Sequence, residues 1–348
     1  MKLLNILKNV KPNIFTIFLI VTIFLMVCAT FYSVPLIPQV PIVSATANLW
    51  NDTSYWYMKI KDNPTLHPYN DEQVNWIIDH RDSPTINWAG WTNVVYDCYD
   101  DTSVYHILDT DSGTYYDVPF PDPYPIDIPS DADGAVTIVD WYRGDVWDFW
   151  SVTATGGTYH VGDSMRLDLN GDGLYPKNGW GSGGSGIASV AYLIRPEEIE
   201  AGVINHALGC SFGTVGPYEG GSRYSSTKGF VHPPAAHTDR KVASTNPYEV
   251  PEGSRIQLDP AIDLDALGLS STGKIIAKAM QDYGIVCAEA GGEWVIYAEH
   301  ELTADWNPPS MGGSIMSPIG SLVTSSYNPW RIIDYTEYPL EDDLSEYE

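Results

Sequence analysis

The sequence has little positive charge. Its 348 residues include 18 Lys and Arg against 45 Asp and Glu, which gives a formal net charge of −27. Nucleic-acid binding depends on basic side chains that neutralise phosphates, and anionic membrane surfaces also attract bases. We therefore expect no nucleic-acid partner and no membrane contact through the folded surface. An excess of acid is typical of proteins that stay soluble in a salty or acidic exterior.

Cysteine is also scarce. Cys28 lies in an apolar run, and the other three, Cys98, Cys210 and Cys287, allow at most one intrachain disulfide. The sequence contains no CxxC spacing, so we expect no zinc–thiolate site. The sequence has no GxSxG elbow, no P-loop and no GxGxxG fingerprint, and its Gly/Ser run at 181–186 does not have the pattern of a phosphate loop. These absences argue against serine-hydrolase, nucleotide-binding and dinucleotide-binding functions.

The first 50 residues predict a targeting segment. Lys2, Lys8 and Lys11 precede an uncharged apolar run, 14–34, which is long enough to span a bilayer and places the rest of the chain outside the cytoplasm. An uncleaved anchor and a signal peptide cleaved near Ala47 both stay open. The expected segments are a cytoplasmic basic lead (1–13), a transmembrane helix or signal (14–34), a Pro-rich spacer (35–50), one extracytoplasmic domain (51–335) and an acidic disordered tail (336–348).

The remaining pattern predicts a mainly β protein, an antiparallel β-sandwich or jelly roll with two or three short helices. Many short apolar strands alternate with turns, and no regular βαβ alternation favours a parallel sheet. Helices are expected over 70–80, 196–201 and 271–283, the last capped by Ser271 or Thr272. The run 285–301 is expected to form a hairpin that turns at its glycine pair.

The apolar hairpin at 137–152 contains an unexpected aspartate. Asp148 lies within a strand, where aspartate is unfavourable. If the turn uses residues 143–145, Asp140 lies opposite Asp148, and two such carboxylates can divide into an acid and a base. In the alternative interpretation, Asp148 accepts hydrogen bonds from a nearby loop or pairs with Arg143. The adjacent Trp141, Trp147 and Trp150 favour a functional role, because sugar rings stack on flat aromatic faces.

A second candidate is half of a calcium loop. Asp168, Asn170 and Asp172 match the start of the D-x-[DN]-x-[DN]-G pattern. Gly179 occupies the twelfth position, where a bidentate acid is expected. Calcium binding and a metal-free Asx turn both stay open.

Histidines supply the third candidate. His206 lies in an apolar segment, where a hydrogen-bonded core histidine is the common case. His232 and His237 stand five residues apart, and this pair indicates either a metal site or general-base chemistry.

Several blocks resemble those of a large group of mostly uncharacterised secreted bacterial proteins, in the same order. They are TIVDWYRGDVWDFW, NGDG, LIRPEEIEAGVINHALG, PPAAH and MQDYGIVCAEAGGEW, and they span most of residues 50–307. The resemblance implies a jelly-roll fold and a carbohydrate-active function, without a settled reaction. Residue by residue, it places Asp148, Glu198, Asn205, His206 and His237 in shared blocks.

Together these observations predict an extracytoplasmic polysaccharide-degrading enzyme that acts on a polysaccharide or a cell-surface glycan. In the leading hypothesis, a glycoside hydrolase, Asp148 is the nucleophile or base and Asp140 or Glu198 is the acid. The predicted substrate-binding residues are Trp141, Trp147, Trp150, Asn205 and His232.

Two alternatives stay open. In a polysaccharide lyase, His206 or His237 would abstract a proton beside a uronate carboxylate that Asn205 neutralises, and basic residues in 195–241 would attract the anion. In a non-enzymatic, membrane-anchored sugar-binding protein, the aromatic residues would act without the acids. None of the three requires a cofactor, and calcium binding at the half-motif stays open.

Overall fold

The computed structural model describes residues 48–80, 83–99, 102–130, 133–176, 179–212, 231–238, 248–291, 293–306, 311, 315–324 and 326–338. All of them belong to one compact unit of the chain, Ser44–Glu348. In this described part, no helix is long and apolar enough to cross a bilayer. The predicted segments 1–13 and 14–34 lie outside it.

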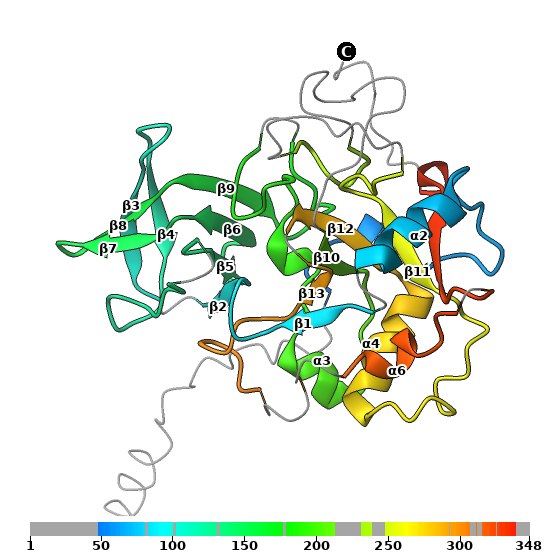
Figure 1. Cartoon of the computed structure of the whole chain (residues 1–348). Helices are drawn as coiled ribbons and strands as arrows, with labels where there is room; N and C mark the ends of the chain where they lie inside the picture. Colours follow the sequence, from blue (N-terminus) through cyan, green and yellow to red (C-terminus); the bar gives the residue numbers. More distant parts are fainter. Residues whose placement is uncertain are drawn as a thin grey trace, which may run out of the picture. The chain divides into compact units, whose positions relative to one another are not determined.

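The described chain is mainly β, as predicted, with three sheets (Figure 1). The six-stranded sheet has the order β1 (Thr85–Asn87), β13 (Val295–Tyr297), β10 (Leu208–Phe212), β12 (Ile285–Ala290), β11 (Arg255–Leu258) and β14 (Trp330–Ile333). The hairpin sheet consists of β2 (Val94–Cys98), β5 (Val136–Asp140), β6 (Asp145–Trp150) and β9 (Asp163–Asp168). The outer sheet consists of β4 (Tyr115–Pro119), β3 (Val104–Asp109), β8 (Thr158–Val161) and β7 (Thr153–Thr155).

The hairpin sheet is covered on both faces. Trp147 and Phe149 of β6 pack with Phe120 and Tyr159 in a cluster shared with the outer sheet, which makes this part sandwich-like. Because side chains alternate along a strand, Val146 points the other way, into a cluster shared with the six-stranded sheet. This two-sided burial explains why the strands of the hairpin read as continuous apolar runs.

Helices cover the other face of the six-stranded sheet (Figure 1). The helices α2 (Asn70–His80), α3 (Pro196–Ala201) and α4 (Ser271–Asp282) confirm the predicted segments, and a fourth, α6, spans Ser317–Gly320. The predicted caps of α4, Ser271 or Thr272, lie one or two residues too late. The Ser270 hydroxyl accepts the N–H of Gly273 at 3.0 Å, so Ser270 is the N-cap.

Three predictions about the chain path are wrong. Among the described strands, four pairs are parallel: β1–β13, β10–β12, β2–β5 and β3–β8. The expected hairpin at 285–301 does not form, because β10 lies between β12 and β13. The predicted disordered tail starts too early, since Tyr338 is buried and Glu337 pairs with Lys61 at 2.9 Å. Alternation and turn residues indicate where strands begin and end, but not their neighbours or direction.

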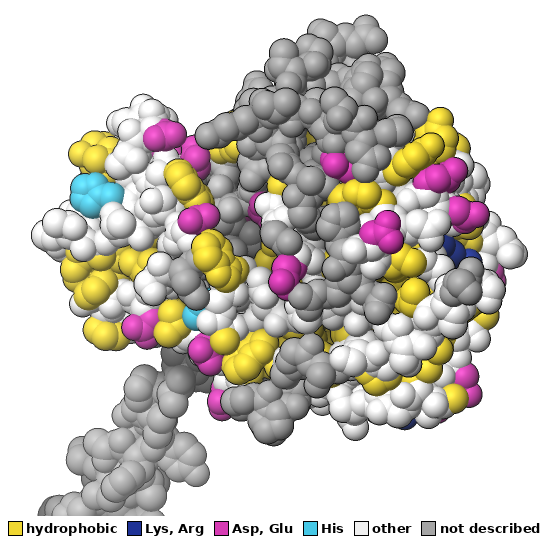
Figure 2. Space-filling view, viewed as in Figure 1, with side chains coloured by type: hydrophobic (Ala, Val, Ile, Leu, Met, Phe, Trp, Pro, Cys, Tyr) yellow, Lys and Arg dark blue, Asp and Glu magenta, His cyan; other side chains and the backbone are white. Residues whose placement is uncertain are grey.

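The three remaining cysteines, Cys98, Cys210 and Cys287, are buried and free. Figure 2 shows acidic side chains spread over the visible face, with few Lys or Arg among them.

Candidate functional site

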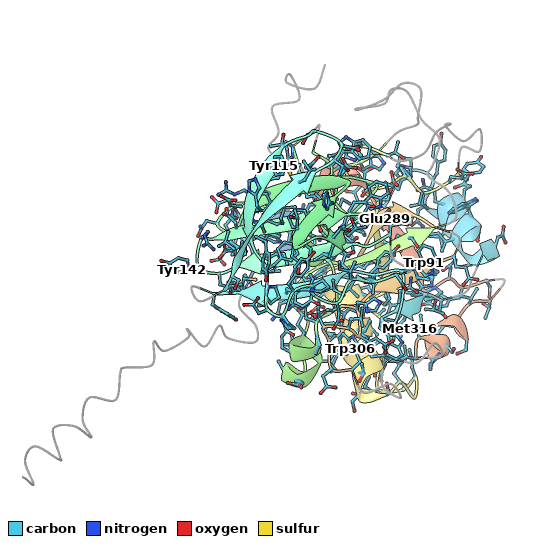
Figure 3. The ribbon with its side chains drawn as sticks, turned by 90° about the vertical axis from the view of Figure 1, so that its left-hand side faces the viewer. Trp91, Tyr115, Tyr142, Glu289, Trp306 and Met316 are labelled. Atoms are coloured by element: carbon cyan, nitrogen blue, oxygen red, sulfur yellow. The ribbon has the colours of Figure 1, made fainter. Side chains whose placement is uncertain are left out.

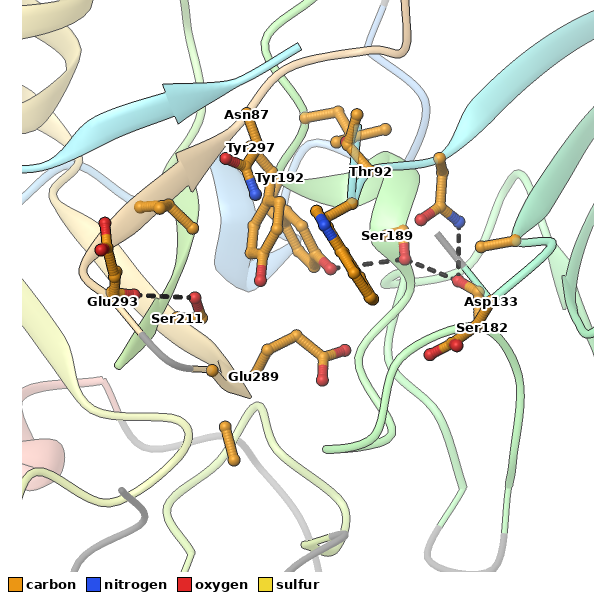
Figure 4. Close-up of a pocket in the computed structure, with 17 residues that line it drawn as sticks. Asn87, Thr92, Asp133, Ser182, Ser189, Tyr192, Ser211, Glu289, Glu293 and Tyr297 are labelled. Atoms are coloured by element: carbon orange, nitrogen blue, oxygen red, sulfur yellow. Dashed lines mark hydrogen bonds between the residues drawn. The ribbon is translucent and has the colours of Figure 1, made fainter. Parts of the chain in front are cut away.

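A cavity of about 580 Å³ lies where the six-stranded sheet meets the loops that lead into the hairpin sheet (Figure 4). Its wall combines carboxylates with aromatic rings, namely Asp133, Glu289 and Glu293 with Trp91, Tyr192 and Tyr297. Hydroxyl and amide groups come from Asn87, Thr92, Asn93, Ser182, Ser189 and Ser211, and the rest of the lining is aliphatic or glycine. Among the described residues that line the cavity there is no Lys, Arg or His. The site is therefore acidic, aromatic and rich in hydrogen-bonding groups.

Two aromatic residues at this site depend on particular backbone features: a glycine beneath the ring of Tyr192 and a left-handed conformation at Trp91. Tyr192 follows the 3₁₀ helix η3 (Ser189–Ala191), and its ring lies against Gly209 of β10. A Cβ at Gly209 would lie 2.1 Å from Cδ2 of Tyr192, so only glycine allows this approach. Trp91 has a φ of 52°, a left-handed conformation that is uncommon outside glycine, and its side chain is 64% exposed. In Figure 3, Trp91 and Glu289 lie near each other, whereas Tyr115 and Tyr142 lie away from them.

The Gly/Ser run 181–186, for which the sequence predicted no site, forms part of the wall. The backbone N–H of Gly184 donates to Oε1 of Glu289 at 2.8 Å. A Cβ at Gly183 would lie 2.7 Å from the carbonyl oxygen of Ile187, so the backbone could not pass there with a side chain. Small residues directly before an apolar segment are a signal of close backbone approach, and this signal could have marked the site.

Asp148 lies behind this wall and is fully buried. Its Oδ1 accepts the hydroxyl protons of Thr137 at 2.9 Å and Ser182 at 2.7 Å. Its Oδ2 accepts the hydroxyl proton of Tyr175 and, at 3.4 Å, the backbone N–H of Ser189. Burial raises the pKa of Asp148 overall, and these donors offset only part of that rise. The interpretation in which Asp148 accepts hydrogen bonds from a nearby loop is confirmed for Ser182, whereas Ser189 belongs to the 3₁₀ helix η3.

Tyrosines in the wall are held protonated. Burial, followed by the negative charge of Glu289, raises the pKa of Tyr192 and of Tyr297 well above the ordinary value. Both phenols therefore keep their protons at physiological pH and act as neutral hydrogen-bonding groups.

The predicted pairing of Asp140 with Asp148 is wrong. The hairpin turn uses four residues, 141–144, so Asp140 faces Asp145 and Asp148 faces Thr137. Asp140 instead accepts the backbone N–H groups of Tyr142 and Arg143, and its Oδ2 pairs with Nη1 of Arg143 at 2.9 Å. Asp140 thus stabilises the turn, and this capping sets the longer loop and the shifted register.

The three tryptophans predicted to bind substrate lie in three different environments. The indole N–H of Trp141 donates to Asp97 at 2.7 Å. Trp147 is buried, with its ring 5.3 Å from that of Tyr116. Trp150 is 38% exposed, and its ring lies on Gly162, where a Cβ would lie 2.6 Å from Cε3. None of the three lines the cavity.

The structure brings Glu198 and His206 together, but not at the cavity. Oε1 of Glu198 lies 3.0 Å from Nε2 of the buried His206, and its Oε2 accepts the N–H of Arg195 at the start of α3. Burial lowers the pKa of His206, but the charge of Glu198 and its hydrogen bond outweigh burial, so the pKa is raised overall. Asn205, beside this pair, is exposed.

The other two histidines are also elsewhere. The rings of His237 and Trp180 lie 3.6 Å apart between centroids, and those of His232 and His67 lie 6.5 Å apart. Both His232 and His237 are buried. Of the basic residues predicted to attract an anion, Arg195 is described and pairs with acids, including Asp97 at 3.4 Å. Arg223, Lys228, Arg240 and Lys241 lie outside the described residues.

The calcium half-motif forms two Asx turns. Asp168 accepts the N–H of Asn170 at 2.8 Å, and Asp172 accepts the N–H of Leu174 at 3.0 Å. Among the residues that the structure describes, no group of three or more His, Cys, Asp or Glu is placed to hold a metal ion. Calcium binding here stays a prediction.

A scan against protein-family models and searches of curated proteins and solved structures find no match to this chain. The resemblance to secreted carbohydrate-active proteins therefore stays a prediction, and the function must be argued from the site.

Proposed function

We propose that the protein is an extracytoplasmic glycoside hydrolase that binds an uncharged saccharide in the cavity of about 580 Å³. One observation carries the proposal: carboxylates, aromatic rings and hydroxyl or amide groups line a single hollow without any basic side chain among the described residues. Aromatic faces suit sugar rings, while acids and amides suit sugar hydroxyls.

The candidate catalytic carboxylates are Glu289 and Glu293, in place of the Asp140–Asp148 pair. Both line the cavity, one at the end of β12 and the other just before β13. Glycoside hydrolysis needs one carboxyl group as an acid and a second as a base or nucleophile. Asp148 does not suit the second role, because it is fully buried and its oxygens already accept hydrogen bonds.

The lyase alternative has less support from this cavity. A uronate would place its own carboxylate among Asp133, Glu289 and Glu293, and like charges repel. His206 and His237, the predicted bases, do not line it.

Sugar binding without hydrolysis is a second candidate, and one contact favours it. The N–H of Gly184 donates to Glu289 at 2.8 Å, which stabilises the ionised carboxylate and ties it to the wall. A glutamate held in this way can orient a sugar hydroxyl without any proton transfer.

A panel of neutral oligosaccharides tests the proposal, with binding measured by calorimetry and cleavage by the release of reducing ends. We expect one member to bind and to be cleaved. Glu289→Gln and Glu293→Gln should each lower the cleavage rate by about 100-fold or more while binding persists. Glu301→Gln, at an exposed glutamate outside the cavity, is the matched control and should keep full activity.

Three results would count against hydrolysis in different ways. Binding of a neutral sugar without cleavage would favour the second candidate. An unsaturated product that absorbs in the ultraviolet would identify a lyase. Failure of every neutral saccharide to bind would overturn the proposal.

A further inference from the structure

A chain of hydroxyl groups joins the buried Asp148 to the cavity. Ser182 Oγ lies 2.7 Å from Oδ1 of Asp148 and 2.6 Å from Oγ of Ser189. The hydroxyl of Tyr192, whose ring lines the cavity, lies 3.3 Å from the same Oγ of Ser189 (Figure 4). Asp148 itself does not line the cavity, so it acts on a ligand through residues that do, of which Ser182 makes the shortest contact with its Oδ1.

Oδ1 of Asp148 sets the direction of the protons in the chain, because it accepts hydrogen bonds from both Thr137 and Ser182. A serine hydroxyl has one proton to donate, and Ser182 lies 2.7 Å from the accepting Oδ1. Ser182 therefore gives its proton to Asp148, and Ser189 must then donate to Ser182. The amide of Asn93 also donates to Ser182 Oγ at 2.7 Å, which leaves that oxygen one lone pair for the proton of Ser189.

The last link in the chain is Tyr192. Because Ser189 has already donated its proton to Ser182, its oxygen is left to accept one from the phenol. Tyr192 then has only lone pairs to offer the cavity.

We propose that Asp148 is a positioning residue that makes Tyr192 a hydrogen-bond acceptor toward the ligand. The cavity then selects, at this point, a ligand group that donates a hydrogen bond, such as a sugar hydroxyl. The nearby carboxylate of Glu289 is also an acceptor, so both groups select the same ligand chemistry. The part of this inference that concerns sugars rests on the proposed function, whereas the direction of the chain does not.

Replacing Asp148 by asparagine should reverse the chain. The side-chain NH₂ of the asparagine cannot face the backbone N–H of Ser189, which is fixed and only donates. It must face the side where Thr137 and Ser182 lie, whose hydroxyls can rotate to accept. Ser182 would then donate to Ser189 and Ser189 to Tyr192, which would turn the phenol proton toward the cavity.

The first measurement needs no ligand. NMR of protein labelled at tyrosine Cζ, assigned with Tyr192→Phe, reports the hydrogen bonding of the Tyr192 phenol. We expect its signal to shift in Asp148→Asn and in Ser182→Ala. Thr137→Val is the matched control, because it also removes a hydroxyl donor from Oδ1 of Asp148 but lies outside the chain. A Tyr192 signal that moves as far in Thr137→Val as in Ser182→Ala, or that stays unmoved in both chain variants, would overturn the inference.

The second measurement uses the best neutral oligosaccharide of the panel and its derivatives with single hydroxyls replaced by fluorine, which cannot donate. In the wild type, one derivative should bind about 10- to 100-fold more weakly, because Tyr192 is left without a donor. In Asp148→Asn the same replacement should cost much less. An equal loss in both proteins would overturn the inference.

The two arms separate this inference from the proposed function. If no saccharide binds, the proposed function fails and the NMR result alone decides the direction of the chain. If Asp148→Asn does not fold, Ser182→Ala, which breaks the chain and keeps the carboxylate, takes its place in both arms.

Discussion

Asp140 and Asp148, two acids of one hairpin, have different roles at the residue scale. Asp140 caps its own turn through two backbone N–H groups. Asp148 accepts hydrogen bonds from hydroxyl groups that are distant in sequence, including those of Ser182 and Tyr175. A buried carboxylate is therefore identified by its donors and by its distance from a cavity, not by its strand alone.

The Glu198–His206 pair should make stability depend on pH. The pKa of His206 is raised in the folded protein, so the protonated form is favoured by folding. This stabilisation is fully present below the unfolded value of 6.5 and is lost as pH rises through the folded-state pKa. Denaturation curves should show Glu198→Gln to be less stable than the wild type by about 2 kcal/mol near pH 5.5, with a smaller difference near pH 9.

An exposed pair provides the control for this prediction. His106 and Asp117 lie 2.8 Å apart with side chains 62% and 76% exposed. Asp117→Asn should change stability by less than about 0.5 kcal/mol at either pH, because exposed pairs contribute little. A Glu198→Gln difference that does not shrink with rising pH would contradict the assignment.

At the scale of elements, β10 is the strand that supports the cavity. It lies between β12 and β13, and its Gly209 allows the ring of Tyr192 to rest on the strand. In Gly209→Ala, the new methyl group would overlap that ring, so Tyr192 should move into the cavity. We expect a loss of about 1–3 kcal/mol in unfolding free energy and weaker ligand binding, measured by denaturation and calorimetry.

Gly202→Ala, at the C-terminal end of α3, is the matched control for Gly209→Ala. Gly202 has a φ of 79°, and nothing lies within 4 Å of the position that an alanine methyl group would take, so the substitution strains only the backbone. It should cost about 1 kcal/mol and leave binding unchanged. Equal effects of the two substitutions on binding would show that Tyr192 does not depend on Gly209.

At the scale of the whole molecule, the charge of −27 should make stability depend on salt. Like charges repel across the compact protein, and ions screen that repulsion. We expect the melting temperature at pH 7 to rise by a few degrees between about 0.01 and 0.15 M NaCl. The rise should shrink toward about pH 4, where many carboxylates are protonated. A melting temperature that is independent of salt at pH 7 would contradict this.

The location of the protein in the cell is also a property of the whole molecule. We propose that residues 14–34 carry the described unit out of the cytoplasm, because Lys2, Lys8 and Lys11 directly precede them and no Lys or Arg follows before Lys59. Cell fractionation should find the unit outside the cytoplasm, and the mass of its N-terminal peptide distinguishes an intact anchor from cleavage near Ala47. Recovery in the cytoplasm would rule out this export.

The sequence by itself determined the elements whose cause is local. The acidic first turn and periodic apolar face of α2, the proline and glycine that bound α3, and the mainly β character all follow from neighbouring residues. Such features depend on contacts within a few positions, so a local pattern carries the information.

Only the tertiary structure decided the site. Glu289 and Gly184 are distant in sequence, as are Asp148 and Ser182, and each pair is joined by a hydrogen bond between the Gly/Ser run and a strand of a different sheet. Strand order and parallel pairing are set by long-range burial, which no short pattern records. The chemistry of the residues could therefore be seen in the sequence, whereas their meeting in one cavity could not.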